Sequence, residues 1–231
     1  MSEDRYMMTV STDVVIFGYR PDSVSLQVVL IRRAHSPYGG HLALPGGRVE
    51  LAESVDAAAL RELREETGLR PGYVEQLYTF SEPDRDPRGR VISVAYFALV
   101  SVKRFEPHAG SDASHASWFE VNDKLMSQLA FDHRDILKKG VERLRNKIRW
   151  TPIGFDLLPR KFTLGELRKL YETVLGRPLD RSNFRKKLLA SGILTEIGET
   201  RPGVGCPPSA VYQFDKKAYD KAVKDGFVFE V

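Results

Sequence analysis

Cysteine is almost absent from this sequence of 231 residues, which contains only Cys206. A single cysteine excludes an intramolecular disulfide and any metal site built from several thiolates. The sequence also has no apolar run long enough to span a bilayer, and its first residues, MSEDRYMMTVST, lack the apolar segment of a secretory signal. We therefore expect a soluble, cytoplasmic protein without a membrane partner.

The sequence has no large excess of charge of one sign: it contains 35 Lys and Arg residues and 31 Asp and Glu residues. Residues 151–231 hold 14 of the basic and 10 of the acidic residues, which accounts for the whole net charge of +4. A basic C-terminal third is consistent with a polyanionic partner and equally with a solvated basic surface.

The order of the expected elements indicates an α/β protein with a small second domain. Strands are expected over residues 13–19, 25–32, 74–81, 91–102 and 116–121, with helices over 54–67 and 133–147. After Trp150 the pattern changes, and residues 151–159, with two prolines and a glycine, resemble a linker. We expect a first domain over residues 1–150, with 133–147 as a linking helix, and a second over 151–231.

Three carboxylates lie on one side of the helix expected over 54–67. At 100° per residue, Glu62, Glu65 and Glu66 share an arc of about 100°. Carboxylates this close repel one another unless a cation lies between them, and hard oxygen ligands favour Mg²⁺ or Mn²⁺. An alternative is a solvated acidic face in which Arg61 and Glu65 form an i,i+4 pair.

The spacing around these residues carries a resemblance. Counting from Gly47, five residues precede Glu53, seven more precede Arg61, and ELREETGL follows. Over these 23 residues, Gly47–Leu69, the sequence matches every defined position of the motif called the Nudix box and so resembles the Nudix hydrolase superfamily. The resemblance implies an α/β/α sandwich with a mixed sheet and a strand–loop–helix metal site. Its implied roles are metal ligands or the water-activating base for Glu62, Glu65 and Glu66, a loop-bracing pair for Glu53 and Arg61, and backbone beside the metal for Gly46 and Gly47.

The loop before the expected strand VISVAYFAL is a candidate ligand-binding segment. The loop over residues 84–90 resembles Nudix proteins that handle ADP-ribose, and Arg85 and Arg88 in it could contact a diphosphate bidentately. Arg32, at the end of the second strand, could also reach a phosphate. Asp-Pro and Arg-Gly are ordinary turn signals as well, so a purely structural loop is the alternative. We expect ADP-ribose or a related nucleotide as the ligand.

The C-terminal third has the pattern of a winged helix-turn-helix. Thr163 and Glu166 form a capping box before a helix that Gly176 ends, and Asp180 can cap a second helix running to residue 191. A hairpin over residues 193–214 follows. On the second helix, the side opposite its apolar residues offers base and phosphate contacts from Asn183, Lys186 and Lys187.

Other basic residues of this domain are less clearly directed toward DNA. Arg181 and Arg185 fall nearer the apolar arc of the second helix and could pack internally, whereas Arg201 in the wing loop could follow a groove edge. Winged helices also serve as protein-interaction modules, so fold alone leaves that alternative open.

The segments FTLGELRKLYETVLGRPLDRSNFRKKLLASGIL and AFDHRDIL resemble the NrtR family of Nudix-related transcriptional regulators of NAD metabolism. The resemblance implies a homodimer that binds a palindromic DNA operator, represses genes of NAD biosynthesis or salvage, and releases DNA when ADP-ribose binds. The alternative is a Mg-dependent ADP-ribose pyrophosphatase, alone or combined with regulation. The complete box leaves hydrolysis open, because a base outside it, for which Glu82 and Asp112 are candidates, is not assigned by sequence.

Overall fold

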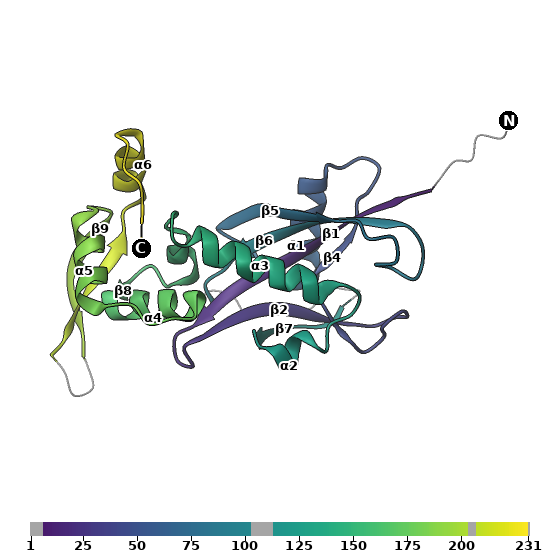
Figure 1. The fold of residues 1–231 in the computed structure, drawn as a ribbon, viewed down its shortest axis with the longest axis horizontal. Helices are drawn as coiled ribbons and strands as arrows, with labels where there is room; N and C mark the ends of the chain where they lie inside the picture. Colours follow the sequence, from purple (N-terminus) through teal and green to yellow (C-terminus); the bar gives the residue numbers. More distant parts are fainter. Residues whose placement is uncertain (1–6, 103–112, 203–206, 231) are drawn as a thin grey trace. The chain divides into compact units, whose positions relative to one another are not determined.

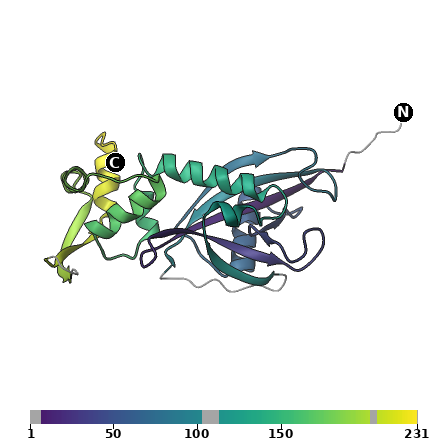
Figure 2. The same ribbon diagram turned by 60° about the horizontal axis from the view of Figure 1, so that its bottom comes forward.

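The protein was studied as a computed structural model, which describes residues 7–102, 113–202 and 207–230. The chain forms two compact units (Figure 1; Figure 2). Most of the sequence up to Val141 belongs to the first unit. The second unit contains the chain from Glu142 onward and also takes in the short segment Tyr19–Leu26. Each unit has its own buried apolar residues.

Among the described residues, the first unit contains a mixed sheet of seven strands. The sheet runs in the order β3-β2-β1-β6-β5, with β4 paired to β1 and β7 paired to β2. Strands β1 and β6 are parallel, whereas β5 pairs antiparallel with β6 and β4 antiparallel with β1. The strands are β1 (Thr9–Arg20), β2 (Ser25–Arg33), β3 (Leu42–Ala43), β4 (Gly46–Arg48), β5 (Tyr73–Phe80), β6 (Val91–Leu99) and β7 (Ala113–Glu120).

Both faces of this sheet are covered by helices, because alternate residues of β1 are apolar on both sides. Val14 and Ile16 belong to one buried cluster with Leu63 of α1 (Val55–Thr67). On the opposite face, Val15 and Phe17 lie 3.2 and 3.3 Å from where a Cβ on Gly140 of α3 (His133–Lys147) would stand. The expected α/β/α sandwich with a mixed sheet is confirmed (Figure 1).

Helix ends in this unit follow the sequence signals. The Ser54 side chain accepts a hydrogen bond from the backbone N–H of Ala57 at 3.1 Å, and Gly68 ends α1 with a left-handed φ of 69°. Helix α3 has the expected bounds. The short helix α2 (Asp123–Met126) and the short strands β3 and β4 were not expected from the sequence, because two to four residues carry too little periodicity.

The second unit contains a winged helix-turn-helix, as expected. Helix α4 (Leu164–Leu175) begins at the capping box formed by Thr163 and Glu166, and α5 (Arg181–Ala190) begins at the Asp180 cap. The rings of Tyr171 and Phe184 make an edge contact between the two helices at 5.5 Å. A three-stranded sheet in the order β8-β10-β9 completes the unit, with β8 (Phe162–Thr163), β9 (Leu194–Arg201), β10 (Ser209–Phe214) and then α6 (Lys216–Lys224).

The segment expected to be a linker, residues 151–159, is folded into the second unit. It contains the 3₁₀ helix η2 (Ile153–Leu157), in which Ile153, Gly154 and Leu157 are buried. Proline and glycine here start and tighten a packed turn instead of marking a flexible connection. A Cβ on Gly154 would stand 3.0 Å from Cε2 of Tyr171, so the glycine permits this close packing.

Replacing Gly154 with alanine should therefore lower the free energy of unfolding by about 1–3 kcal/mol, because the new methyl group would overpack the Tyr171 ring. The matched control is Gly165→Ala in α4, where a Cβ would meet only the Thr163 hydroxyl at 3.7 Å and helix propensity favours alanine. Urea denaturation of both variants measures the effect. If Gly154→Ala is as stable as the parent protein, η2 packs against Tyr171 more loosely than the 3.0 Å approach indicates.

Candidate functional site

The loop before α1 brings backbone and carboxylates into close contact. Gly46 and Gly47 of β4 pair with Asp13 and Thr12 of β1. A Cβ on Gly46 would stand 2.1 Å from the backbone oxygen of Thr12, and one on Gly47 would stand 2.1 Å from Oε1 of Glu62. At Gly46 the obstacle is backbone, so only glycine fits there, whereas a side chain at position 47 would have to displace the Glu62 carboxylate.

Arg61 connects three of the carboxylates in the Nudix box. Its Nη2 and Nε donate to the two carboxylate oxygens of Glu53 at 2.6 and 3.1 Å, and its Nη1 lies 2.8 Å from Oε1 of Glu62. Nη1 also lies 3.1 Å from Oε2 of Glu65, and Nη2 donates to the backbone oxygen of Arg48. These hydrogen bonds raise the pKa of Arg61, and the bond to Glu53 has the largest effect. Arg61 braces the loop, and the i,i+4 pair with Glu65 is present as well.

Glu66 differs from the other carboxylates of the box because no cation pairs with it in the described part of the chain. Its Oε2 accepts a hydrogen bond from the backbone N–H of Gly46 at 2.7 Å. Burial, followed by the negative charges of Glu62 and Asp13, raises the pKa of Glu66 to about 8. Glu65 is turned outward, with 60% of its side chain exposed. The common arc expected from the sequence therefore brings Glu62 and Glu66, but not Glu65, to the glycine loop.

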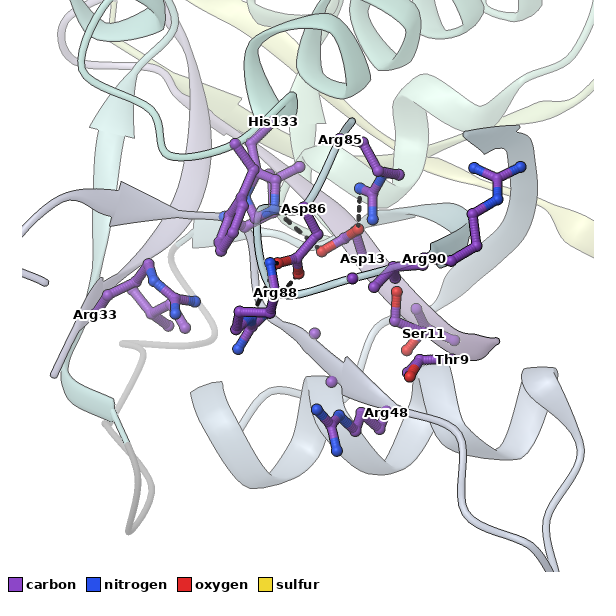
Figure 3. A pocket seen from close by; sticks show the side chains of 18 of the residues that line it. Thr9, Ser11, Asp13, Arg33, Arg48, Arg85, Asp86, Arg88, Arg90 and His133 are labelled. Carbon is purple, nitrogen blue, oxygen red and sulfur yellow. Dashed lines mark hydrogen bonds and ion pairs between the residues drawn. The ribbon is translucent and has the colours of Figure 1, made fainter. Parts of the chain in front are cut away.

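A cavity of about 390 Å³ opens beside Glu66 in the first unit (Figure 3). The cations around it differ in how they are neutralised. Arg88 pairs with Asp86 at 2.7 Å, whereas Arg33, Arg48 and Arg90 form no ion pair with a described carboxylate. The lining residues are Met7, Thr9, Ser11, Thr12, Asp13, Ile31, Arg33, Leu44, Gly46, Gly47, Arg48, Glu66, Arg85, Asp86, Arg88, Gly89, Arg90, Val91, Phe131 and His133. The surplus of guanidinium groups suits a phosphorylated ligand.

Of the arginines expected to bind ligand, Arg88 and Arg85 line the cavity and Arg32 does not. The neighbouring Arg33 lines the cavity instead, on the strand face of Ile31, whereas Arg32 donates to the Gly40 backbone oxygen at 2.6 Å. The side chain of Arg85 is only 5% exposed. Alternation along β2 was the sequence signal that could have distinguished Arg33 from Arg32.

Arg85 belongs to a buried network at the cavity wall. Its guanidinium donates to both carboxylate oxygens of Asp132, at 2.7 and 2.8 Å, and lies 3.3 Å from Oδ2 of Asp13. Oδ2 of Asp13 also accepts from the Ser93 hydroxyl at 2.5 Å. Nδ1 of His133 accepts from the Leu44 N–H at 2.9 Å, which leaves the proton of the neutral ring on Nε2, 3.3 Å from Oδ1 of Asp13. No periodicity in the sequence predicts this network.

Because His133 is buried, its own contribution to the free energy of unfolding should fall as the pH is lowered through about 6.5. Burial lowers the pKa of His133 despite the facing carboxylates of Asp13 and Asp132, and Arg85 and Arg33 lower it further. The unfolded chain takes up a proton at the ordinary histidine pKa near 6.5, whereas the folded chain does so only at lower pH, so acid favours unfolding. The variant His133→Asn keeps an acceptor for the Leu44 N–H and should lose this pH dependence.

Thermal unfolding at pH 7.5 and 5.5 measures this effect, with the exposed His41→Asn as the matched control. Lowering the pH from 7.5 to 5.5 should change stability less favourably in the parent and in His41→Asn than in His133→Asn, because all three share the opposite contribution of Glu66. An identical change in all three proteins would assign the acid sensitivity to other groups.

In the second unit, α5 presents its polar residues to solvent. Phe184 and Leu188 are buried, whereas every basic or amide residue expected to contact DNA on this helix is exposed: Arg181, Asn183, Arg185, Lys186 and Lys187. Arg181 and Arg185 are therefore not packed internally. Arg185 lies close enough to Tyr212 of β10 to lower the pKa of that tyrosine, although burial raises it overall.

Arg201 has a different setting from the other expected DNA contacts. It is the last residue of β9, and its Nη1 lies 2.5 Å from Oε1 of Glu166, which belongs to the capping box of α4. Its Nη2 donates to the backbone oxygen of Lys161 at 2.7 Å. Arg201 thus connects the start of the wing to the start of α4.

Two residues outside the Nudix box were candidates for the catalytic base. Glu82 is exposed and does not line the cavity, and Asp112 lies outside the described residues.

Comparison with known proteins bears on both units. A model of the NUDIX domain matches residues 8–140, and a model of the NrtR DNA-binding winged helix domain matches residues 154–214. An Acinetobacter baylyi protein named "ADPR responsive transcriptional repressor NtrR" is 37% identical over 216 residues, which cover 93% of this chain and 84% of that protein. The chain belongs to the NrtR family. Its fold and family were therefore correctly expected from the sequence.

Two further relatives are informative: one has been solved with DNA and with ADP ribose, and the other is named as an enzyme that acts on ADP-ribose. Shewanella oneidensis NrtR, solved in complex with a 27mer DNA, has a TM-score of 0.78 at 30% identity and covers 91% of this chain and 95% of that one. Its Nudix domain, solved with ADP ribose, has a TM-score of 0.56 at 33% identity and covers 62% of this chain and 93% of that one. An "ADP-ribose pyrophosphatase" of Methanocaldococcus jannaschii is 46% identical over 112 residues, 48% of this chain and 64% of that protein.

The residues present fit a divalent metal ion, which Nudix hydrolases generally use. Within the described residues no group of three or more carboxylates, histidines or cysteines converges on one point. The half-buried Glu62 and Glu66 nevertheless repel each other beside the glycine backbone. The buried hydroxyl of Thr12, on the facing strand β1, has no hydrogen-bond partner among the described residues. Such oxygens are the ligands that hard divalent cations prefer.

No helix in the described ranges is long and apolar enough to cross a membrane.

Proposed function

We propose that this NrtR-family chain is a DNA-binding transcriptional repressor whose Nudix domain binds ADP-ribose. The observation that carries the proposal is that the chain aligns over nearly its whole length, 91%, with an NrtR protein solved on DNA. The arginine-rich cavity suits a diphosphate, and the exposed Asn183, Lys186 and Lys187 on α5 suit a DNA groove. In this division of labour residues 1–150 bind the ligand and residues 151–231 bind DNA.

We further propose the regulatory setting that belongs to this function. The repressor acts in the cytoplasm as a homodimer on a palindromic operator, because a two-fold protein matches two half-sites. Genes of NAD biosynthesis or salvage are its targets, and ADP-ribose is the metabolic signal. A ligand can release the operator only if it binds the DNA-free arrangement of the protein more tightly than the DNA-bound one, so both affinities are linked.

The ligand site is proposed to include Mg²⁺ or Mn²⁺. Glu62 and Glu66 would hold the ion beside the Gly46–Gly47 backbone, while Glu65 and Glu53 act through Arg61. When bound, the ion would neutralise diphosphate charge and polarise a phosphoryl oxygen. Arg33, Arg48, Arg88 and Arg90 of this chain orient the phosphates, and Arg85 holds the cavity wall in place through Asp132.

One experiment tests the regulator. Duplexes selected from a random pool by the full chain serve as the DNA, and a gel shift then follows their release as ADP-ribose is added with Mg²⁺ or Mn²⁺. We expect enrichment of a palindromic sequence and its release by ADP-ribose but not by AMP plus ribose 5-phosphate. Failure of the pool to yield any preferred sequence would overturn the regulator.

The second candidate is an ADP-ribose pyrophosphatase, alone or combined with regulation. It is favoured by the complete Nudix box and by the similarity to the Methanocaldococcus jannaschii protein. Incubation with ADP-ribose and Mg²⁺ or Mn²⁺, followed by chromatography of AMP, distinguishes the two. Rapid AMP formation without DNA binding would leave the enzyme as the function, whereas DNA release without AMP would leave a non-hydrolysing sensor.

A further inference from the structure

Residues 215–230 lie beyond the part of the chain that the winged-helix model matches, yet they are attached to the end of α5. The backbone N–H of Asp215 donates to the oxygen of Ile193, three residues after α5, at 2.8 Å, and the Asp215 side chain caps α6. The Tyr219 ring of α6 lies 5.8 Å from the Phe214 ring of β10. The start of α6 is therefore fixed beside the segment that follows α5.

The chain turns back after α6. Gly226 adopts a left-handed φ of 88°, and the N–H of Phe227 donates back to a carbonyl oxygen of α6. Within residues 227–230 the exposure alternates, because Phe229 is 3% exposed whereas Val228 is 70% exposed. No residue of the fully described helix α6 is itself buried. Phe229 is therefore the apolar anchor of this segment.

Phe229 and the last turns of α5 line a cavity of about 270 Å³ in the second unit. The lining residues on α5 and just after it are Lys187, Leu188, Ala190 and Ser191, and those after α6 are Phe227, Val228, Phe229 and Glu230. Only two side chains of α5 are buried, Phe184 and Leu188. Phe184 meets the Tyr171 ring of α4, and Leu188 lies at the cavity that Phe229 lines. Helix α5 is thus held by apolar side chains at two points, and Phe229 lies at the second.

The second point of attachment bears on how α5 would read DNA. A bidentate amide must be held to within about 0.5 Å of its productive position, so the contact of Asn183 with a base edge requires a fixed helix. A lysine reaches a phosphate as a point charge on a flexible stem and tolerates a tilt of the helix. A tilt of α5 about the Phe184 contact would redirect Asn183 but leave Lys186 within reach of the DNA backbone. Sequence discrimination should therefore depend on the second point more than general affinity does.

We propose that Phe229 is a positioning residue for sequence recognition, because it fixes the C-terminal half of α5 from a segment outside the winged-helix domain. The inference rests on the proposed DNA binding. Removing the Phe229 ring leaves the helix and its exposed cations in place but enlarges the cavity beside Leu188. The helix then keeps the Phe184 contact and gains freedom to tilt about it.

The test measures how well the full chain distinguishes two duplexes. Fluorescence anisotropy with the selected operator and a scrambled duplex gives the ratio of the two affinities for the parent, for Phe229→Ala and for the exposed control Val228→Ala. We expect Phe229→Ala to lower this ratio about tenfold through weaker operator binding, with an unchanged salt slope, and Val228→Ala to leave the ratio unchanged. A merely structural defect would reduce the active fraction and so affect both duplexes alike. An unchanged ratio in Phe229→Ala would therefore overturn the inference.

A second variant, Phe229→Leu, keeps the test decisive if the alanine variant does not fold. Leucine retains the apolar contact but fills less volume, so a cooperative thermal transition should persist while the ratio falls about two- to threefold. An unchanged ratio in this variant would overturn the inference even where the alanine variant gives no signal. If the parent prefers no duplex, the proposed function fails and the inference fails with it; if the parent and both variants discriminate equally, only the inference fails.

Discussion

Exchanging Glu66 for glutamine should raise the free energy of unfolding of the metal-free protein by about 3 kcal/mol at pH 7 and abolish its response to Mn²⁺. Burial, Glu62 and Asp13 raise the pKa of Glu66 to about 8, although the Gly46 N–H and Arg33 oppose this. The unfolded chain releases the proton near pH 4.5, whereas the folded chain keeps it until about pH 8. Stability is therefore lost as the pH rises through this window, and glutamine has no proton to lose.

The response to metal should change in the opposite direction. In the parent protein an ion between Glu62 and Glu66 would stabilise their charged forms, so Mn²⁺ should raise the melting temperature at pH 7.5. Glutamine still accepts the Gly46 N–H but is a poor ligand, so the increase should disappear together with the metal-dependent part of ADP-ribose binding. The variant would then be more stable and less able to bind, which is a common trade-off at functional sites.

Glu65→Gln is the matched control for this exchange. The Glu65 side chain is 60% exposed and its described partner is Arg61, so the stability of the metal-free protein should change by less than about 0.5 kcal/mol. Differential scanning calorimetry of the three proteins with and without Mn²⁺ makes the comparison. An undiminished Mn²⁺ response in Glu66→Gln would place the ion elsewhere in the protein.

The fold followed from the sequence where a local signal agreed with the long-range packing. Helix α1 was expected from residues 57–60, the run of Arg and Glu that follows and the stop at Gly68. The winged helix was expected from the Thr163 capping box and the two helix ends. Residues 151–159 were misread as a linker, because the tight packing of Gly154 on Tyr171 depends on tertiary contacts that proline and glycine content does not reveal.

The candidate site was only partly visible in the sequence. The Nudix box and the Glu53–Arg61 pair follow from spacing within one loop and helix. Arg33 comes to the cavity from β2, where alternation is the only local signal for it, whereas Phe131 and His133 come from a distant segment that no periodicity places beside β2. Glu62, Glu65 and Glu66 do lie on one side of the helix, as expected, but Glu65 pairs with Arg61 and is largely exposed. The direction of each side chain depends on its partners, which periodicity does not reveal.

Two exchanges on α5 should weaken DNA binding in different ways, because Lys186 carries a charge and Asn183 a bidentate amide. Both residues are exposed on the helix, opposite the buried Phe184 and Leu188. A lysine that contacts phosphate contributes to every duplex alike, whereas asparagine can pair with an adenine edge in the major groove. Lys186→Ala should therefore lower affinity for all duplexes about five- to tenfold at physiological salt and reduce the salt slope by about 1.

Asn183→Ala should instead lose about 1–3 kcal/mol on the selected operator only, with an unchanged salt slope, because a base contact releases no counterion. Fluorescence anisotropy with the operator and a scrambled duplex at several salt concentrations separates the two effects. Lys124→Ala on α2, an exposed lysine of the Nudix unit, is the charge-matched control and should leave both quantities unchanged. An unaltered slope for Lys186→Ala would show that α5 meets DNA through another arc, with Arg181 and Arg185 as the next cations to test.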